Sequence, residues 1–189
     1  MADIDSVLEQ VRAHYLSAYI EVIDDHKKRH KPASPEILLE VGGREDKPFP
    51  YRLYRTDLMS GAVESPNMTD FNNDTHLTFE PIEFVANKEL SVTLSSISWD
   101  AIEFDSECFN PESELLANWA LKWIDTEDDK KQDENGLGGY IHSITFPEIT
   151  ESHCSFSVDF GSAGIGSFFE LINVFISLGI RELSIHSNS

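Results

Sequence analysis

The first part of the chain repeats apolar residues at the spacing of one helical face, which predicts an amphipathic helix over residues 4–25. Ser6 and Glu9 fit a capping box, and the basic run His26–Lys31 complements the helix dipole at the other end. Pro32 and Pro35 then stop the helix. The apolar stripe consists of Ile4, Val7, Leu8, Val11, Tyr15, Tyr19, Val22 and Ile23.

From Glu36 to Glu107 the apolar period changes to two, which is typical of strands with one buried face. Turn residues punctuate this region, among them Gly61, Pro66 and the cluster Asn72-Asn73-Asp74. We therefore expect an antiparallel meander whose solvent face is rich in carboxylates, as the alternation of Glu80 with apolar residues suggests. The predicted strands are 37–41, 51–58, 77–84, 90–96 and 101–105.

A second helix is predicted from Asn110-Pro111-Glu112, which combines a capping residue, a proline at the first helical position and early acids. It continues to about Asp125, with Trp119 and Trp123 four residues apart on one apolar stripe that we assign to the core. The acidic segment 125–139 that follows is predicted to be a solvated loop, because its spacing fails the pattern of a calcium-binding EF-hand.

The last fifty residues predict two paired strands, a helix and a final strand. Strands are expected at 140–146 and 155–160, and the turn Gly161–Gly166 leads to a helix over 167–178. Gly179 caps this helix before a strand at 180–186, which completes a strand-helix-strand unit. The predicted fold class is α+β (mixed α/β) in one domain of residues 1–189, with residues 1–31 as a helix that packs on the body or forms a peripheral appendage.

Charge changes the functional picture most. The chain has 189 residues and a formal net charge of −20. Residues 1–55 carry 9 bases and 10 acids, whereas residues 56–189 carry 5 bases and 24 acids, so the excess belongs to the folded body. Such a field repels nucleic acids and anionic membranes and attracts basic proteins. We therefore predict a basic protein partner, with no direct contact to nucleic acid or membrane.

Cellular location is predicted from three absences. The first residues carry acids where a secretory signal has bases, and no apolar run is long enough to span a bilayer. Cys108 and Cys154 are the two cysteines, too few for a disulfide framework. A cytoplasmic protein is the expectation.

Catalytic and metal-binding patterns are weak. The order of glycines in Gly161–Gly166 matches no nucleotide-binding motif, and a nucleophile built from Cys154 with His142 and Asp159 requires a chance meeting of strands. The histidines His142, His153 and His186, with Glu148, show no metal-ligand spacing. We predict no catalytic residue, cofactor or metal, and keep as an alternative a small hydrolase-like enzyme with a site near Gly161–Gly166 and His142.

The densest acidic segment, residues 100–134, holds twelve acids and three bases. Carboxylates at this density can replace phosphates in a basic cleft, which favours an immunity protein that inhibits a nuclease-like toxin. A phage-type DNA mimic that inhibits a host defence protein is an alternative, and so is a structural subunit that assembles through Tyr15 and Tyr19. The predicted partner-binding residues are Asp105, Glu107, Glu112, Glu114, Trp123, Asp125, Glu127, Asp128, Asp129, Asp133 and Glu134.

Overall fold

The computed structural model describes residues 3–43, 46–62, 65–71, 77–150 and 152–187, which form three helices and ten strands. The mixed α+β class predicted from the sequence is confirmed. The helices are α1 (Ile4–Arg29), α2 (Glu114–Ile124) and α3 (Ile165–Ser177). The strands are β1 (Ala33–Glu40), β2 (Leu53–Ala62), β3 (Ser65–Thr69), β4 (Ile82–Ala86), β5 (Leu90–Leu94), β6 (Ile102–Glu107), β7 (Ser143–Ile144), β8 (Glu148–Ile149), β9 (His153–Asp159) and β10 (Glu182–His186).

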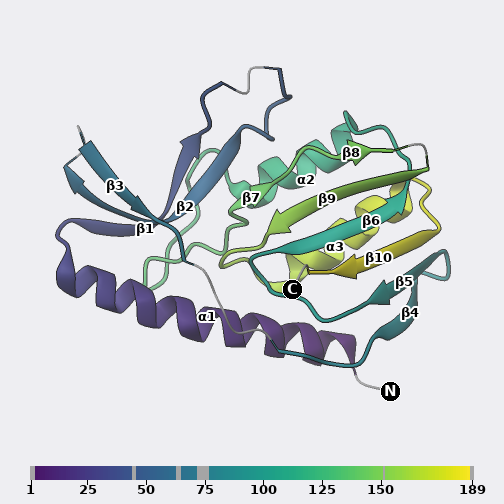
Figure 1. Cartoon of the computed structure of the whole chain (residues 1–189), viewed down its shortest axis with the longest axis horizontal. Coiled ribbons are helices and arrows are strands. Elements are labelled where there is room, and N and C mark those ends of the chain that lie inside the picture. Colours follow the sequence, from purple (N-terminus) through teal and green to yellow (C-terminus); the bar gives the residue numbers. More distant parts are fainter. Residues whose placement is uncertain (1–2, 44–45, 63–64, 72–76, 151, 188–189) are drawn as a thin grey trace.

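All ten strands belong to one sheet with the order β1-β2-β7-β9-β6-β10-β5-β4, to which β3 adds beside β2 and β8 beside β9 (Figure 1). The predicted antiparallel pairing of neighbours is found for β1–β2, β2–β3 and β4–β5, but the meander is not continuous, because β6 pairs with β9 and β10 and not with β5. β9 and β10 are both antiparallel to β6 and hence parallel to each other, and α3 connects them. The predicted strand-helix-strand unit is therefore present, with β6 inserted between its two strands.

One face of the sheet packs on α2 and α3, which lie behind it in Figure 1. Phe104 of β6 is fully buried there, with ring centroids 6.1 Å from Phe168 and 5.9 Å from Phe175 of α3. Trp119 of α2 is also in the core and donates a hydrogen bond to the carbonyl of Ser167. Because side chains alternate along a strand, the other face of β4, β5, β6, β9 and β10 remains open to solvent.

α1 runs along one edge of the molecule (Figure 1). Its predicted apolar stripe is confirmed as the buried face, and Tyr15 and Tyr19 are 1% and 0% exposed. The two tyrosine rings pack against each other and against Phe71, so they do not form the exposed apolar patch that assembly through this helix requires. None of the helices in the described part of the chain is long and apolar enough to cross a membrane.

Helix starts differ from the predictions because local hydrogen bonds compete with capping. Ser113, not Asn110, caps α2, since the Ser113 hydroxyl accepts from the Leu115 N–H while Asn110 forms a turn with Glu112. Ser6 lies inside α1, where its hydroxyl accepts from the Gln10 side chain. The Gly179 stop after α3 is confirmed, with a φ of 80° that suits glycine.

Two strands in the middle of the chain also differ from the predictions. The predicted strand 77–84 begins only at Ile82, because the Phe79 N–H and carbonyl bond to the Ser96 hydroxyl instead of a neighbouring strand. Strand β3 was not predicted, since Pro66 marked its residues as a turn. The turn cluster Asn72-Asn73-Asp74 lies outside the described residues.

We expect Phe104→Ala to lower the free energy of unfolding by about 3–5 kcal/mol, because it leaves a cavity under the sheet. Phe49→Ala is the matched control, since Phe49 is 45% exposed and its loss is expected to cost less than about 1 kcal/mol. Urea denaturation followed by fluorescence measures both. Equal losses would contradict the assignment of Phe104 to the core.

Candidate functional site

Six carboxylates, not counting Asp159 at the end of β9, lie together on the open side of the sheet, and we call these six the acidic sheet face. Its positions follow from strand register: Asp105 pairs with Ser184 on one side and Ser155 on the other, and Ser184 pairs with Thr93. These residues share one face because paired residues point the same way. The carboxylates of the acidic sheet face are Glu83, Glu103, Asp105, Glu107, Glu148 and Glu182.

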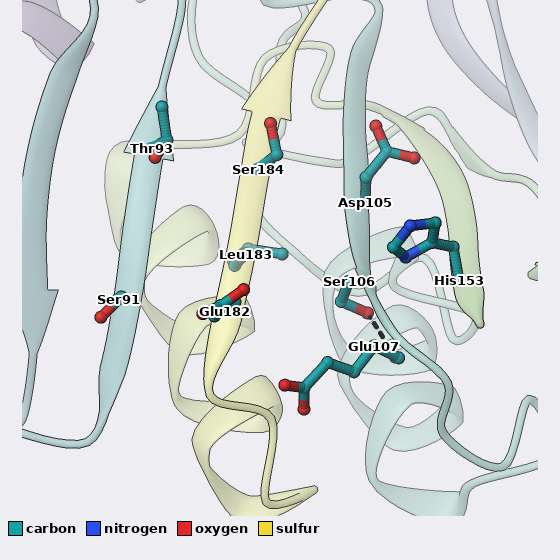
Figure 2. Close-up of a pocket in the computed structure, with 9 residues that line it drawn as sticks. All are labelled: Ser91, Thr93, Asp105, Ser106, Glu107, His153, Glu182, Leu183 and Ser184. Carbon is teal, nitrogen blue, oxygen red and sulfur yellow. Dashed lines mark hydrogen bonds between the residues drawn. The ribbon is translucent and has the colours of Figure 1, made fainter.

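A groove of about 640 Å³ crosses the acidic sheet face (Figure 2). Short hydroxyl side chains make it hollow, with Ser91 and Thr93 on β5 and Ser184 on β10. Glu107 extends from β6 toward β10, and Asp105, Glu182 and His153 complete the lining with Ser106 and Leu183 (Figure 2). The groove is thus long, polar and bordered by negative charge.

No lysine or arginine occurs in β4, β5, β6, β8, β9 or β10. The bases in these strands are His153 and His186. The His186 ring lies between two carboxylates, with Nδ1 3.4 Å from Asp105 Oδ2 and Nε2 3.7 Å from Glu103 Oε2. Within these six strands, the negative charge of the acidic sheet face is therefore opposed by histidine alone.

The structure divides the predicted partner-binding residues among several places. Asp105 and Glu107 lie on the acidic sheet face, whereas Glu112 and Glu114 are exposed at the start of α2. Trp123 is half-buried on α2, where its Nε1 donates to Glu170. The remaining six belong to α2's C-cap and the loop after it.

Three of the six acids of this segment accept hydrogen bonds, and only one of the six is buried. Asp125 is buried, caps α2 in the left-handed region and accepts from the Lys130 N–H. Asp128 accepts from Arg55 of β2, and Asp133 accepts from the N–H groups of Asn135 and Leu137. Asp128 and Asp133 are exposed despite these bonds, and Glu127, Asp129 and Glu134 are exposed as well. The loop lies against α1 and β1, through Lys27 to the Asn135 carbonyl and Gly136 to Pro35, so the predicted set does not form one surface.

Sequence reasoning therefore missed four members of the acidic sheet face. The alternation Glu103, Asp105, Glu107 was a usable signal, because it places three acids on one side of a strand. Glu83, Glu148 and Glu182 join them only through pairing between strands distant in sequence.

A second group of polar side chains is buried around His142, which precedes β7. The imidazole is 1% exposed; its Nε2 lies 2.8 Å from Glu36 Oε1, and its Nδ1 lies 2.9 Å from Asp57 Oδ1 and 3.7 Å from Asp159 Oδ2. Burial disfavours the charged ring, but the three carboxylates outweigh burial and hold the pKa of His142 well above its ordinary value. Burial raises the pKa of Asp159 to about 7, an effect that His142 opposes and Asp57 reinforces.

Arg55 of β2 is another buried base. Its guanidinium donates to the carbonyls of Glu36, Ile124 and Asp125 and to the Asp128 carboxylate, and it lies 3.7 Å from the centre of the Tyr140 ring. These bonds connect β1, β2, the end of α2 and the following loop.

The predicted enzyme site is brought together in part. Gly161 packs directly on His142, since a Cβ there would lie 2.2 Å from the imidazole Cδ2. The glycine turn is occupied by α1, because Arg12 donates to the carbonyls of Ser162 and Ala163. The nucleophile hypothesis is wrong, because Cys154 faces the core near one end of β9 while the His142 N–H bonds to the Asp159 carbonyl at the other end.

The histidines weighed as metal ligands are also apart. His153 is at the start of β9, whereas His142 lies beside Asp159 at the other end of this strand, and His186 lies on β10 against Glu103 and Asp105.

Comparisons with protein-family models, curated proteins and solved structures give no significant match. The functional argument therefore rests on the side chains themselves.

We expect Arg55→Ala to lower the free energy of unfolding by about 3–5 kcal/mol, because it removes a charged donor from three buried carbonyls. Arg181→Ala removes a guanidinium that is 62% exposed and is expected to cost less than about 1 kcal/mol. Chemical denaturation of both variants is the measurement. A small effect of Arg55→Ala would show that the guanidinium is not what holds these segments.

Thiol chemistry gives a further check. Burial raises the pKa of Cys154 to about 11, so its thiolate fraction near pH 8 is lower than that of an ordinary thiol, whereas Cys108 is exposed. A disulfide reagent should modify one thiol of the folded protein rapidly and both after unfolding. Cys108→Ser should abolish the rapid phase, and a rapid phase that persists would place Cys154 at the surface.

Proposed function

We propose that the protein binds a basic protein partner through the acidic sheet face. The observation that carries this proposal is a set of neighbouring strands with six outward carboxylates, no lysine or arginine, and a groove along them. Acids placed for solubility alone need neither a shared face nor the exclusion of bases from it.

The physical chemistry of the groove suits cationic side chains. Its hydroxyl-lined floor lets a partner chain come close to the sheet, and the carboxylates of Asp105, Glu107 and Glu182 surround the space above. A carboxylate can accept two parallel hydrogen bonds from one arginine, which adds geometry to charge attraction. The net charge of −20 accelerates encounter with a basic molecule and makes the rate dependent on salt.

In its most concrete form, the proposal is a cytoplasmic immunity protein that neutralises a toxin enzyme, such as a nuclease, by occupying its basic site. Carboxylates in rows can stand where the phosphates of a nucleic acid substrate would lie. The same face also fits a phage-type DNA mimic directed at a host defence protein. The identity of the captured partner distinguishes the two, since a toxin loses its enzymatic activity and a defence protein its DNA binding.

Neutralising three acids on the face tests the proposal. The triple variant Asp105→Asn, Glu107→Gln, Glu182→Gln should lose a basic partner that the wild-type protein retains at about 150 mM salt. Its matched control is Glu9→Gln, Glu21→Gln, Asp24→Asn, which changes the same residue types on exposed positions of α1 and gives the same net charge. Binding of the partner, first isolated on the immobilised wild-type protein, is measured by calorimetry.

The two triple variants have the same net charge and differ only in where the acids are neutralised. The control variant should bind within about twofold of wild type, while the variant of the acidic sheet face should weaken binding at least about a hundredfold. Equal weakening by both variants would mean that net charge alone attracts the partner, and the site assignment would be wrong.

A further inference from the structure

Three potential metal ligands from separate chain segments meet beside the open face. Asp57 comes from β2, His142 from the segment before β7, and Asp159 from the end of β9. One possible ligand atom from each residue lies within 4.8 Å of the others. Among the described residues, this is the one group of three such side chains close enough to share a metal ion. Ligands of one ion at bond lengths of about 2.0–2.2 Å are about 3–4 Å apart, so small side-chain shifts suffice.

The Nδ1 edge of the His142 imidazole points into this group. Nδ1 is fully buried and has no partner in hydrogen-bonding geometry, although Asp57 Oδ1 lies only 2.9 Å away. A proton on Nδ1 would therefore lie close to the Asp57 carboxylate but poorly aligned with it, so the ring would not be fully satisfied in a buried site. A metal ion bound along the Nδ1 lone pair would satisfy the ring and both aspartates together.

Glu36 prepares the ring for that role. Its carboxylate is completely buried and lies 2.8 Å from Nε2, while its other oxygen accepts from the Gly138 N–H at 2.9 Å. A carboxylate on the far nitrogen keeps the proton there and leaves Nδ1 as the ligand atom, the arrangement common behind metal-bound histidines. Glu36 sits at a φ of 52°, which is unfavourable for a residue with a side chain.

The described surroundings of the three ligands are rich in acids, and the one arginine among them is already bonded. The three ligands line a pocket of about 310 Å³ together with Asp70 and Asp100, and the bases that line it are His142 and Arg55. The Arg55 guanidinium is already bonded to three carbonyls and to Asp128. Four carboxylates, two of them beside His142, thus face a pocket with room for an ion and water.

We propose that Asp57, His142 and Asp159 bind one divalent transition-metal ion, of the Zn²⁺ or Mn²⁺ class. One imidazole nitrogen with carboxylate oxygens suits ions of intermediate hardness better than Ca²⁺ or Mg²⁺, which favour oxygen alone. Three protein ligands leave a coordination position open toward the pocket, where water or a ligand can bind. This proposal departs from our expectation that the chain binds no metal, and it is independent of partner binding by the acidic sheet face.

Calorimetric titration of the metal-free full-length protein with ZnCl₂, and separately MnCl₂, tests the site. At about 150 mM NaCl, which screens weak attraction to surface acids, one of the ions should bind in a saturable step with one ion per chain. Asp159→Asn and Asp57→Asn should each weaken that step by about tenfold or more. Asp24→Asn, the same change on an exposed position of α1, should leave it unchanged.

A measurement on the wild-type protein covers the case in which a variant fails to fold. Nitrogen-15 spectra of the histidine rings should show the ion at Nδ1 of His142, with Nε2 still protonated toward Glu36. Absence of a one-to-one step for both ions would overturn the site. Equal affinities of Asp159→Asn and Asp24→Asn, or a metal shift confined to other histidines, would overturn it as well.

Discussion

The continuity of the ten-stranded sheet depends on a very short strand pairing, the one between β2 and β7. β7 has two residues, and its registered pair with β2 is Tyr54 with Ser143, beside a backbone bond from Arg55 to His142. So short a ladder cannot hold the β1–β2–β3 group to the remaining strands by itself. Buried side chains supply the rest, since Arg55 and the contact of Glu36 with His142 link segments from both sides. These polar bonds stabilise only while every member is present.

Acidic residues serve two physical purposes in this molecule. Those on the acidic sheet face remain in water, keep their charge and act over distance. Glu36, Asp57 and Asp159 are instead removed from most solvent, so their charges require a nearby cation, either the ring of His142 or a metal ion. The same residue type therefore gives a recognition surface in one place and a ligand set in the other, and burial makes the difference.

Local patterns predicted the elements well and their arrangement poorly. The helical stripe of α1, the glycine stop after α3 and the strand-helix-strand unit were all readable, because each depends on neighbours in sequence. The insertion of β6 between β9 and β10 was not readable, since strand order depends on long-range pairing. The group of acids around His142 was not predicted for the same reason. Its members lie at positions 36, 57, 142 and 159, and no spacing rule connects them.

The rows of acids on the open face also govern how the sheet can assemble. Along β6, residues alternate between core side chains such as Phe104 and acids such as Glu103 and Asp105. A slip of β6 by one residue against β9 or β10 would exchange the two sets and drive three carboxylates under α3. Burial of unpaired charge is prohibitive, so misregistered pairings are disfavoured during folding. Exposed carboxylates likewise discourage sheet-to-sheet stacking between molecules, which makes this face a safeguard against aggregation.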